Sequence, residues 1–506
     1  MTRAGNLRDA KRFAIVAGLA MLVVTLFSAK GHLAGIIPRW MSQLDSPRGQ
    51  DAGAGIPISP KLPSGRQRAF PTAEGFGAGA KGGRGGRVIF VTTTADRGEG
   101  SLRACIGQEG PRTCVFRTSG TITLDARSLV VMNPYLTIAG ETAPGGGIAI
   151  RNGARQLRPS LEIVTHDVIV RHIRLRPGPH PVKACCSGAL GFYGNDANDI
   201  IVDHISASWG SDETIDSERA TNVTVQWSFV TEPLLNGGPG KRNRARNMLM
   251  TMGGNISVHH NLFAFGKFRN PQFQLRTKGA AADVVNNVLY SPVWDYVVSF
   301  SDRWTKVRAN VVGNYKIKGR EEPKMDDHLV HLFPEGGNGF SIFVSDNYDE
   351  TYRPDPSYGE ELVIAEPWRG YLAPAPIEVE SVQASPPQLA YDAVLERAGA
   401  TRPARDDVDL RMVEAVRTRS GQLLKNDPAK VGGWPELAAT APPPDRDADG
   451  MADAWEVEMG LNPDDPADGV ADADGDGWTN FEEYLHQLAG DGVGMRAVRA
   501  DHDPTH

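Results

Sequence analysis

The chain has no excess of positive charge and no long apolar segment, and each absence excludes a class of function. Its 506 residues carry a formal net charge of -7 at pH 7 and a pI near 6.0, which argues against a nucleic-acid-binding surface. The apolar run at residues 13–27 is only 15 residues long, whereas a membrane-spanning helix needs roughly 20. Because Lys11 and Arg12 precede it, this run is typical of a secretion signal.

The signal has no clean small-x-small cleavage motif. A cleaved signal peptide and an uncleaved N-terminal membrane anchor therefore both stay open for residues 1–34, and both predict a secreted, periplasmic or cell-surface protein. Residues 35–68 are rich in Pro, Gly and Ser without periodicity, which predicts a linker. We expect a monomer whose only membrane contact is the N-terminal segment.

Cysteine is scarce, with four residues at Cys105, Cys114, Cys185 and Cys186, and no CxxC spacing that would indicate zinc. Export permits disulfides, and four cysteines allow three connectivities. We favour the pairing of Cys105 with Cys114, which closes a short loop containing glycine and proline. Free buried thiols are the alternative.

Long helices are not expected either, because 56 Gly and 35 Pro favour many turns and short strands. Short β-type runs recur over residues 69–352, and their apolar centres lie 23 to 33 residues apart. We take as equivalent centres Ile138, Val170, Val202, Val225, Val258, Val285 and Val312. This repeat predicts a solenoid, in which each coil buries its apolar face against the next.

Leucine-rich repeats are the main alternative solenoid, but they require Leu at fixed positions. Here the runs contain Val and Ile followed by polar residues or by Asn pairs such as Asn286 and Asn287. Asn side chains stacked on successive coils can satisfy turn amides by ladder hydrogen bonds. The sequence therefore predicts an all-β protein, a single-stranded parallel β-helix, with loops inserted on one side to form a cleft.

The pattern changes after residue 352. Residues 390–400 and 406–421 have helical spacing, with Asp406 and Asp407 placed to cap the second helix, and we expect the 353–440 segment to pack on the solenoid. A proline-rich hinge then leads into a small helical module at 441–490 and a tail at 491–506.

Two stretches of this module, DRDADGMADAWE and DADGDGWTNFEE, have the spacing of EF-hand loops. Alternating carboxylates converge on one hard cation, the sixth-position Gly permits a sharp turn, and the final Glu can bind bidentately. The predicted Ca²⁺ ligands are Asp445, Asp447, Asp449, Asp453 and Glu456 in the first loop, and Asp472, Asp474, Asp476, Asn480 and Glu483 in the second. A helix should follow each loop, with Trp455 and Tyr484 on the apolar faces.

Several motifs between residues 69 and 425 together resemble the pectate lyase family of polysaccharide lyases. They are AFPTAEGFGAGAKGGRGG, GSLRACI, LTIAGETAPGGGIAI, IIVDHISASWGSDETID, VTVQWSF, HHNLFAFGKFRNPQF and, more weakly, VDLRMVEAVRTRSG. The resemblance implies a right-handed parallel β-helix that cleaves pectate, an acidic polysaccharide, by β-elimination with calcium. The reaction removes a proton next to a carboxylate, where calcium neutralises the charge that develops.

By resemblance the base is Arg269, in the Arg-Asn-Pro turn of the motif HHNLFAFGKFRNPQF. A guanidinium is normally protonated, so nearby cations such as Lys267 and calcium, together with desolvation, would have to favour its neutral form. The resemblance also places Lys241 at the position that holds the substrate carboxylate, with Lys267 as a second substrate-binding residue. A merely solvated basic loop is the alternative for Lys241.

The resemblance implies that Asp212, Glu213 and Asp216 hold the catalytic calcium. The chain departs from the family pattern nearby: where relatives read GDAL it reads CCSGAL, with Cys186 and Gly188 at the expected acidic positions. Fewer carboxylates imply weaker calcium binding, or calcium held mainly by the uronates of the substrate.

Two other functions stay open. The chain could be a non-catalytic glycan-binding β-helix that lost its metal, or a lyase for another acidic uronan, because the basic loop at 241–246 departs from the relatives. Hydrolysis as in polygalacturonases would need clustered aspartates on adjacent coils, and the sequence lacks their motifs.

Overall fold

The computed structural model describes residues 59–125, 127–179, 187–237, 243–291, 295–319, 328–380 and 382–492. The chain divides into two units, 1–56 and 57–506, and all described residues belong to the second. The predictions for residues 1–34, for most of the linker and for the tail from residue 493 onward therefore lie outside the described residues. Within the described ranges no helix is long and apolar enough to cross a membrane.

The described strands form three sheets, and every ladder within them is parallel. The ten-stranded sheet contains β1 (Arg87–Val91), β2 (Arg112–Phe116), β5 (Leu136–Ala139), β8 (Val168–Arg171), β11 (Asn198–Asp203), β14 (Thr221–Gln226), β17 (Gly254–His259), β20 (Ala282–Val285), β23 (Val307–Val312) and β26 (Phe340–Ser345). The nine-stranded sheet contains β3 (Gly120–Leu124), β6 (Ile148–Asn152), β9 (Arg174–Leu175), β12 (Ser206–Ser208), β15 (Phe229–Thr231), β18 (Leu262–Ala264), β21 (Val288–Ser291), β24 (Tyr315–Lys318) and β27 (Tyr348–Asp349). The eight-stranded sheet contains β4 (Leu129–Val131), β7 (Leu161–Ile163), β10 (Leu190–Tyr193), β13 (Glu213–Glu218), β16 (Arg246–Thr251), β19 (Gln272–Gln274), β22 (Val298–Ser301) and β25 (Val330–Phe333).

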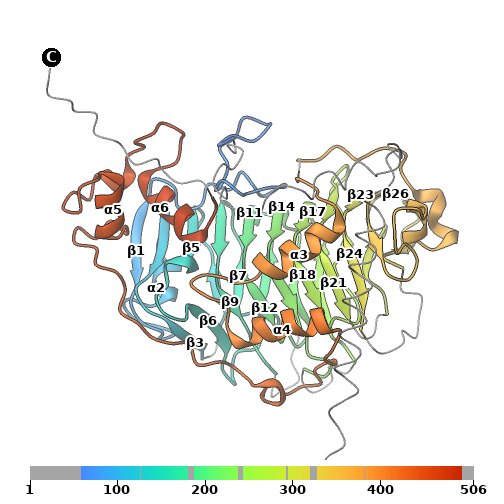
Figure 1. The fold of residues 1–506 in the computed structure, drawn as a ribbon, viewed down its shortest axis with the longest axis horizontal. Helices are drawn as coiled ribbons and strands as arrows, with labels where there is room; N and C mark the ends of the chain where they lie inside the picture. Colours follow the sequence, from blue (N-terminus) through green and yellow to red (C-terminus); the bar gives the residue numbers. More distant parts are fainter. Residues whose placement is uncertain are drawn as a thin grey trace, which may run out of the picture. The chain divides into compact units, whose positions relative to one another are not determined.

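Successive coils each contribute one strand to each sheet, so that β11, β12 and β13 lie directly against β14, β15 and β16 (Figure 1). This is a parallel β-helix, and the predicted fold class is confirmed. Among the connections between two different sheets, the longest run from the nine-stranded to the eight-stranded sheet, as between β9 and β10 and between β15 and β16.

The register of the ten-stranded sheet corrects two predicted equivalences. Val258 pairs with Val284, and Val284 with Val311, so the predicted centres Val285 and Val312 are wrong by one residue. Val284 and Val311 are fully buried in the core, whereas Val285 and Val312 occupy the alternate face. Adjacent valines hide the alternation in the sequence, and a one-residue slip exchanges the two faces of a strand.

A repeated corner joins the ten-stranded sheet to the nine-stranded sheet. The first corner residue has a positive φ near 50–64°, which turns the chain sharply; these residues include His260, Asn286, Gly313 and Asp346. The next residue is Asn on four successive coils: Asn261, Asn287, Asn314 and Asn347. The backbone N and side-chain Nδ2 of Asn261 both lie 3.0 Å from Asn287 Oδ1, and the same pattern repeats along the stack. The predicted Asn ladder is confirmed.

The N-terminal coil carries the short helix α2 (Leu102–Ile106), which is capped by Ser101. A disulfide joins Cys105 to Cys114 with their Cα atoms 5.9 Å apart, which is the favoured pairing. The bond ties α2 to β2. Cys185 and Cys186 lie outside the described residues.

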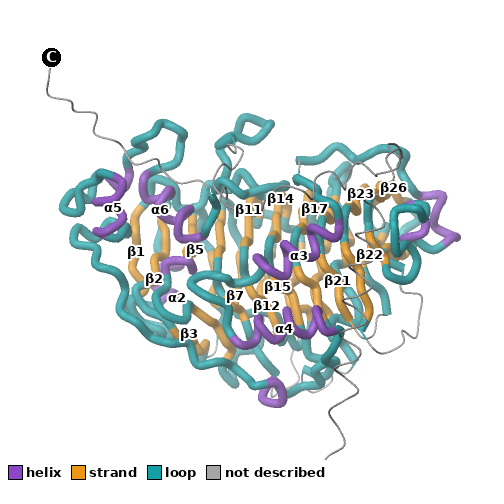
Figure 2. Tube along the Cα trace, in the orientation of Figure 1, coloured by secondary structure: helices purple, strands orange, loops and turns teal. Residues whose placement is uncertain are grey.

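Two helices cover the nine-stranded sheet. They are α3 (Pro387–Arg397) and α4 (Asp407–Thr418), and Asp406 caps α4 by accepting a hydrogen bond from the Asp409 amide. Figure 2 shows both helices lying across the strands near β12 and β15. Val394 and Met412 pack there against Phe229 and Leu262. Short 3₁₀ turns complete the described structure at η2 (Gly140–Thr142), η3 (Glu360–Val363), η4 (Glu366–Tyr371), η5 (Pro428–Val431) and η6 (Asp468–Val470).

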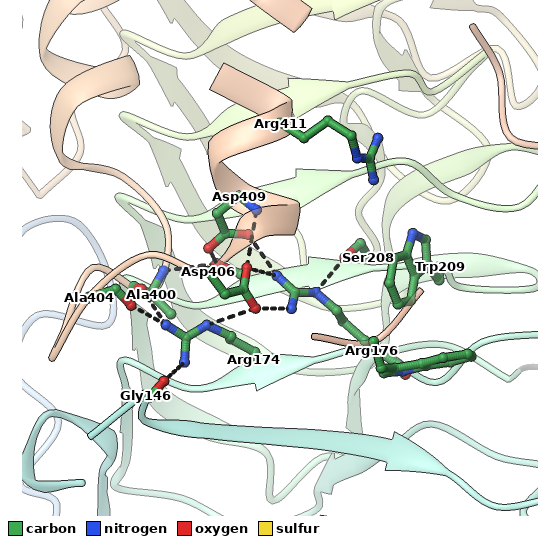
Figure 3. Close-up of polar contacts among 12 residues, drawn as sticks. Gly146, Arg174, Arg176, Ser208, Trp209, Ala400, Ala404, Asp406, Asp409 and Arg411 are labelled. Carbon is green, nitrogen blue, oxygen red and sulfur yellow. Dashed lines mark hydrogen bonds and ion pairs between the residues drawn. The ribbon is translucent and has the colours of Figure 1, made fainter. Parts of the chain in front are cut away.

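A buried ion cluster fastens α4 to the solenoid (Figure 3). Arg176 Nη2 lies 2.8 Å from Asp409 Oδ1 and 3.0 Å from Asp406 Oδ1, and Arg174 Nε lies 3.3 Å from Asp406 Oδ2. All four side chains are at most 4% exposed. Because two cations face two anions, no charge in this cluster is buried without compensation.

The substitution Arg176→Met tests the cluster. It leaves Asp409 and part of Asp406 buried without a cation, so we expect a loss of roughly 3–5 kcal/mol in unfolding free energy. Urea denaturation measures the change. The control is Arg155→Ala, which removes an ion pair between two exposed side chains, Arg155 and Asp125, and should leave the unfolding free energy nearly unchanged. Equal effects of the two variants would contradict the structural role of the cluster.

Candidate functional site

The start of the eight-stranded sheet brings together residues that lie far apart in the sequence. Glu213 at the start of β13 pairs in register with Arg246 at the start of β16, and Arg246 in turn bridges to Phe268, next to Arg269. Each of these residues comes from a different coil. Stacking of the coils therefore places Arg269 beside Glu213, 56 residues earlier.

Three arginines surround two carboxylates at this position. The Arg269 guanidinium pairs with Glu213. Arg246 Nη1 lies 3.0 Å from both Glu213 Oε1 and Asp212 Oδ1, and Arg244 Nη1 lies 2.8 Å from Asp212 Oδ1. The Arg269 side chain is 17% exposed, so the cluster is largely enclosed yet open to a ligand from solvent.

The turn that carries Arg269 is held by its neighbours. Arg269 has a φ of 64°, and its carbonyl accepts a hydrogen bond from the Met248 amide at 2.8 Å. The Asn270 side chain accepts from Asn247 Nδ2 at 2.7 Å, and its backbone amide donates to the Val297 carbonyl at 3.1 Å. The Arg-Asn-Pro turn is thus fixed to the coils on both sides.

Sequence reasoning missed Tyr296. Its ring stacks on Phe268 with centroids 5.5 Å apart, and its hydroxyl interacts with the Arg269 guanidinium. Burial raises the pKa of Tyr296, which keeps the phenol protonated. A single Tyr in an irregular connection belongs to no sequence motif. Its place in the site follows only from its contacts with residues of a neighbouring coil.

The two predicted substrate-binding lysines have different outcomes. Lys267 Nζ lies 3.1 Å from Asp295 Oδ2 and 3.2 Å from Asn243 Oδ1, at the edge of the arginine cluster. Lys241 lies outside the described residues. A substrate-binding role stays a prediction for both.

The predicted catalytic calcium ligands do not converge within the described residues. Asp212 and Glu213 are engaged by the arginines, and Asp216 instead accepts a hydrogen bond from Tyr193 at 2.8 Å. Burial and then the charge of Glu213 raise the pKa of Asp216 to about 8, so this carboxyl is largely protonated at neutral pH. As arranged, the three side chains do not fit a calcium ion.

Gly188, at one of the expected acidic positions, has no room for a side chain. A Cβ atom there would lie 2.6 Å from the Glu213 carbonyl oxygen, closer than real Cβ contacts. The close backbone packing beside Glu213 therefore excludes an acidic side chain at position 188. Cys186 lies outside the described residues.

The C-terminal module gathers carboxylates much more tightly. Helices α5 (Asp453–Met459) and α6 (Asn480–Ala489) follow the two loops, and Trp455 and Tyr484 are buried between them, as predicted. In the first loop Asp445, Asp447 and Asp449 offer oxygens within 4.8 Å of one another, and in the second loop so do Asp472, Asp474 and Asp476.

The closing glutamates of both loops are buried. Glu456 and Glu483 are at most 2% exposed, and the oxygens of both carboxylates accept no hydrogen bond. Burial and neighbouring carboxylates raise the pKa of Asp449 and of Glu456 to about 7. Orphaned, crowded carboxylates fit a hard divalent cation such as calcium.

A further group, His172, Asp203 and His204, does not fit a metal as well. The two imidazoles stack with centroids 4.8 Å apart and an interplanar angle of 23°, so their ring nitrogens do not point at one centre. Arg171 also engages the Asp203 carboxylate at 2.8 Å.

Sequence comparison finds curated relatives. Probable pectate lyase C of Aspergillus flavus is 35% identical over 435 residues, which cover 83% of this chain and 94% of the relative. Probable pectate lyase C of Aspergillus terreus is 33% identical over 431 residues, with the same coverage. Pectate lyase 5 of Ambrosia artemisiifolia is 26% identical over 341 residues, covering 61% of this chain and 80% of the relative. No family model matches the chain.

Solved structures of low identity also match. The cedar pollen allergen jun a 1 is 19% identical with a TM-score of 0.43, covering 65% of this chain and 92% of that structure. A pectate lyase bound to a hexasaccharide is 13% identical with a TM-score of 0.42, covering 69% of this chain and 99% of that structure.

The parallel β-helix and these relatives define a polysaccharide lyase, so the predicted enzyme class, a carbon–oxygen lyase, is confirmed. More particularly, the chain belongs to the pectate lyase family.

Asp216 gives a prediction for pH. Its pKa in the folded protein lies above the value of about 3.9 for an unfolded Asp, so folding retains a proton and stability falls as pH rises from about 4 to 8. In chelator-treated protein, Asp216→Asn should remove part of this fall. Thermal unfolding between pH 5 and 9 measures it. Asp355→Asn is the control, because Ser357 holds the pKa of that exposed carboxyl below its usual value; an unchanged pH slope in Asp216→Asn would refute the prediction.

Proposed function

We propose that the chain cleaves pectate, that is polygalacturonate, by β-elimination with Arg269 as the base. The observation that carries this proposal is the position of Arg269 in a member of the pectate lyase family: it projects from a fixed turn into an accessible cluster of charged side chains. Lys267, Arg246 and Arg244 lie in or beside the same cluster.

The reaction needs a base, an anion-binding group and a leaving oxygen. An Arg269 nitrogen takes the proton from C5, the C5 electrons form the C4–C5 double bond, and the C4–O bond breaks. The departing sugar oxygen takes a proton from solvent. Because Glu213 engages Arg269 in this structure, the substrate must displace Glu213 from Arg269 before the proton can move.

The arginine pair Arg244 and Arg246 is suited to hold the uronate. Guanidinium groups bind carboxylates bidentately, and Arg246 already contacts two carboxylate oxygens at 3.0 Å. A uronate that exchanges with Asp212 would place its negative charge among these cations. Lys267, and Lys241 by resemblance, would extend the basic surface along the polymer.

Calcium would supply charge neutralisation at the uronate. The residues Asp212, Glu213 and Asp216 could ligate it only after the arginines and Tyr193 release them, so no step is derived through a metal at this site. We propose instead that the resident calcium of the protein is bound by the two C-terminal loops, whose aspartates converge and whose closing glutamates, Glu456 and Glu483, accept no hydrogen bond.

Export is part of the same proposal. A disulfide between Cys105 and Cys114 persists only in oxidising surroundings, and it supports a secreted, periplasmic or cell-surface enzyme. Its action on an extracellular polymer would require such a location.

A uronan panel separates the proposed activity from its alternatives. Polygalacturonate should yield ultraviolet-absorbing unsaturated ends. If another uronan is the only polymer cleaved, the chain is a lyase for that uronan and the proposed substrate is wrong. Binding without any cleavage would establish the non-catalytic alternative.

Arg269→Ala tests the base. We expect the rate of unsaturated-product formation to fall by roughly 10²–10⁴-fold, the range of general-base catalysis, with the thermal midpoint little changed. Arg276→Ala, which removes an exposed arginine from the same coil, should keep full activity. Full activity of Arg269→Ala on every uronan cleaved by the wild type would rule out its role.

A further inference from the structure

The C-terminal module packs on the outer face of the ten-stranded sheet, beside β1 (Figure 1). Trp455, Phe481 and Tyr484 form one apolar cluster there with Val88 and Phe90 of β1. The contact is not confined to apolar side chains, because the module also presents acidic groups to arginines of the catalytic body.

Three ion pairs join the module, and Asp491 directly after it, to that body. Arg117 Nη1 lies 3.0 Å from Asp445 Oδ2, Arg84 Nε lies 2.7 Å from Glu482 Oε1, and Arg171 Nη2 lies 2.9 Å from Asp491 Oδ1. The Asp445 and Asp491 carboxylates are at most 3% exposed. The first residue of the first calcium loop is thus also a contact residue of the solenoid.

The first loop gains a carboxylate that its spacing does not contain. Asp468, in the turn η6, offers an oxygen within 4.8 Å of oxygens of Asp449 and Glu456. Asp468 Oδ1 and both carboxylate oxygens of Glu456 are buried and accept no hydrogen bond. The Glu456 side chain is fully enclosed by the protein. A buried carboxylate without partners is costly unless a cation completes it.

Asp453, at the ninth loop position, faces another group. Its Oδ1 accepts a hydrogen bond from the Arg446 amide at 2.9 Å, and its Oδ2 lies 3.0 Å from Arg446 Nε. Both carboxylate oxygens of Asp453 are therefore bonded to Arg446, within the loop. Within the described residues Asp453 belongs to no convergent acidic group.

We propose that Asp468 takes the place of Asp453 as a ligand of the calcium in the first loop, so that one ion ties the loop at 445–456 to the turn at 468–470. The inference rests on the proposed binding of calcium by the C-terminal loops. Asp445, Asp447, Asp449, Asp468 and a bidentate Glu456 supply six carboxylate oxygens, within the six to eight that calcium prefers.

This ligand set couples the two loops to each other and to the solenoid. The Asn480 side chain of the second loop donates a hydrogen bond to the Asp468 carbonyl at 2.8 Å, so the turn that ligates the first ion is held by the second loop. Asp445 connects the same ion to Arg117. Calcium therefore fastens the module onto the edge of the catalytic domain.

Calcium titration of the chelator-treated full chain tests the proposal. Two variants are matched in chemistry: Asp468→Asn and Asp453→Asn each neutralise one carboxylate of the module. We expect Asp468→Asn to weaken one calcium site by roughly tenfold or more in calorimetry, because fewer ligand charges lower affinity, and Asp453→Asn to change it by less than about threefold. The opposite ranking would overturn the proposal.

Hydrogen exchange provides a second readout that needs no variant. Calcium added to the wild type should slow amide exchange at 468–471 and at 445–456 together. Exchange should also slow at Val88 and Phe90 of β1, which contact the module. Protection confined to 445–456 would overturn the role of Asp468. Absence of any calcium binding would instead refute the proposed calcium loops, and neither experiment depends on uronan cleavage, so the role of Arg269 is tested separately.

Discussion

The contacts of the arginine cluster depend on the stacking of one coil on the next at a constant register. The coils of the arginine cluster turn at positive-φ corners, at His204, Trp227 and His260, and a ladder of Asn261, Asn287, Asn314 and Asn347 holds the corners from His260 onward. Because the corner comes at the same level on each of these coils, the following strands begin at matched positions whatever the length of the intervening loop. The stacked strand starts bring Glu213 and Arg246 into one row of the eight-stranded sheet, with Arg269 beside them.

Arginine–carboxylate pairing recurs at three places with three different consequences. Around Arg176 the charges are fully buried and matched, and they fasten α4. Around Arg269 the charges are partly exposed, so an anion from solvent can reach the same guanidinium groups. Around Arg117 the pair is formed by a carboxylate that also belongs to a calcium loop. The degree of enclosure, rather than the type of residue, separates a structural pair from a site that can exchange partners.

The two acidic regions of the chain differ in the same way. Asp212 and Glu213 already have cationic partners, and no side chain fits at Gly188, so the catalytic end holds few oxygens for a metal. The C-terminal loops have the reverse arrangement, with buried oxygens that lack partners. The convergent carboxylates of this chain therefore lie away from the arginine cluster.

Much of this arrangement was predictable from local patterns. Apolar alternation, the Asn pairs, the cap at Asp406 and the loop spacing around Glu456 and Glu483 each concern residues within one element, and the structure contains these elements. The register of Val284 was missed because two adjacent valines satisfy either face. Tyr296 was missed because its contacts are with neighbouring coils, Phe268 before it and His331 after it, and not with residues near it in the sequence.

The sequence by itself determined the repeat, the enzyme family and the spacing of the calcium loops, because these depend on residues a few positions apart and on motifs. Tertiary structure alone decided that Glu213 meets Arg269, that Asp216 turns to Tyr193, and that Asp468 joins Glu456. The physical reason is that charge pairing acts through space. Coil stacking and burial decide which carboxylate meets a cation. Neither produces a regular pattern that can be recognised in the sequence.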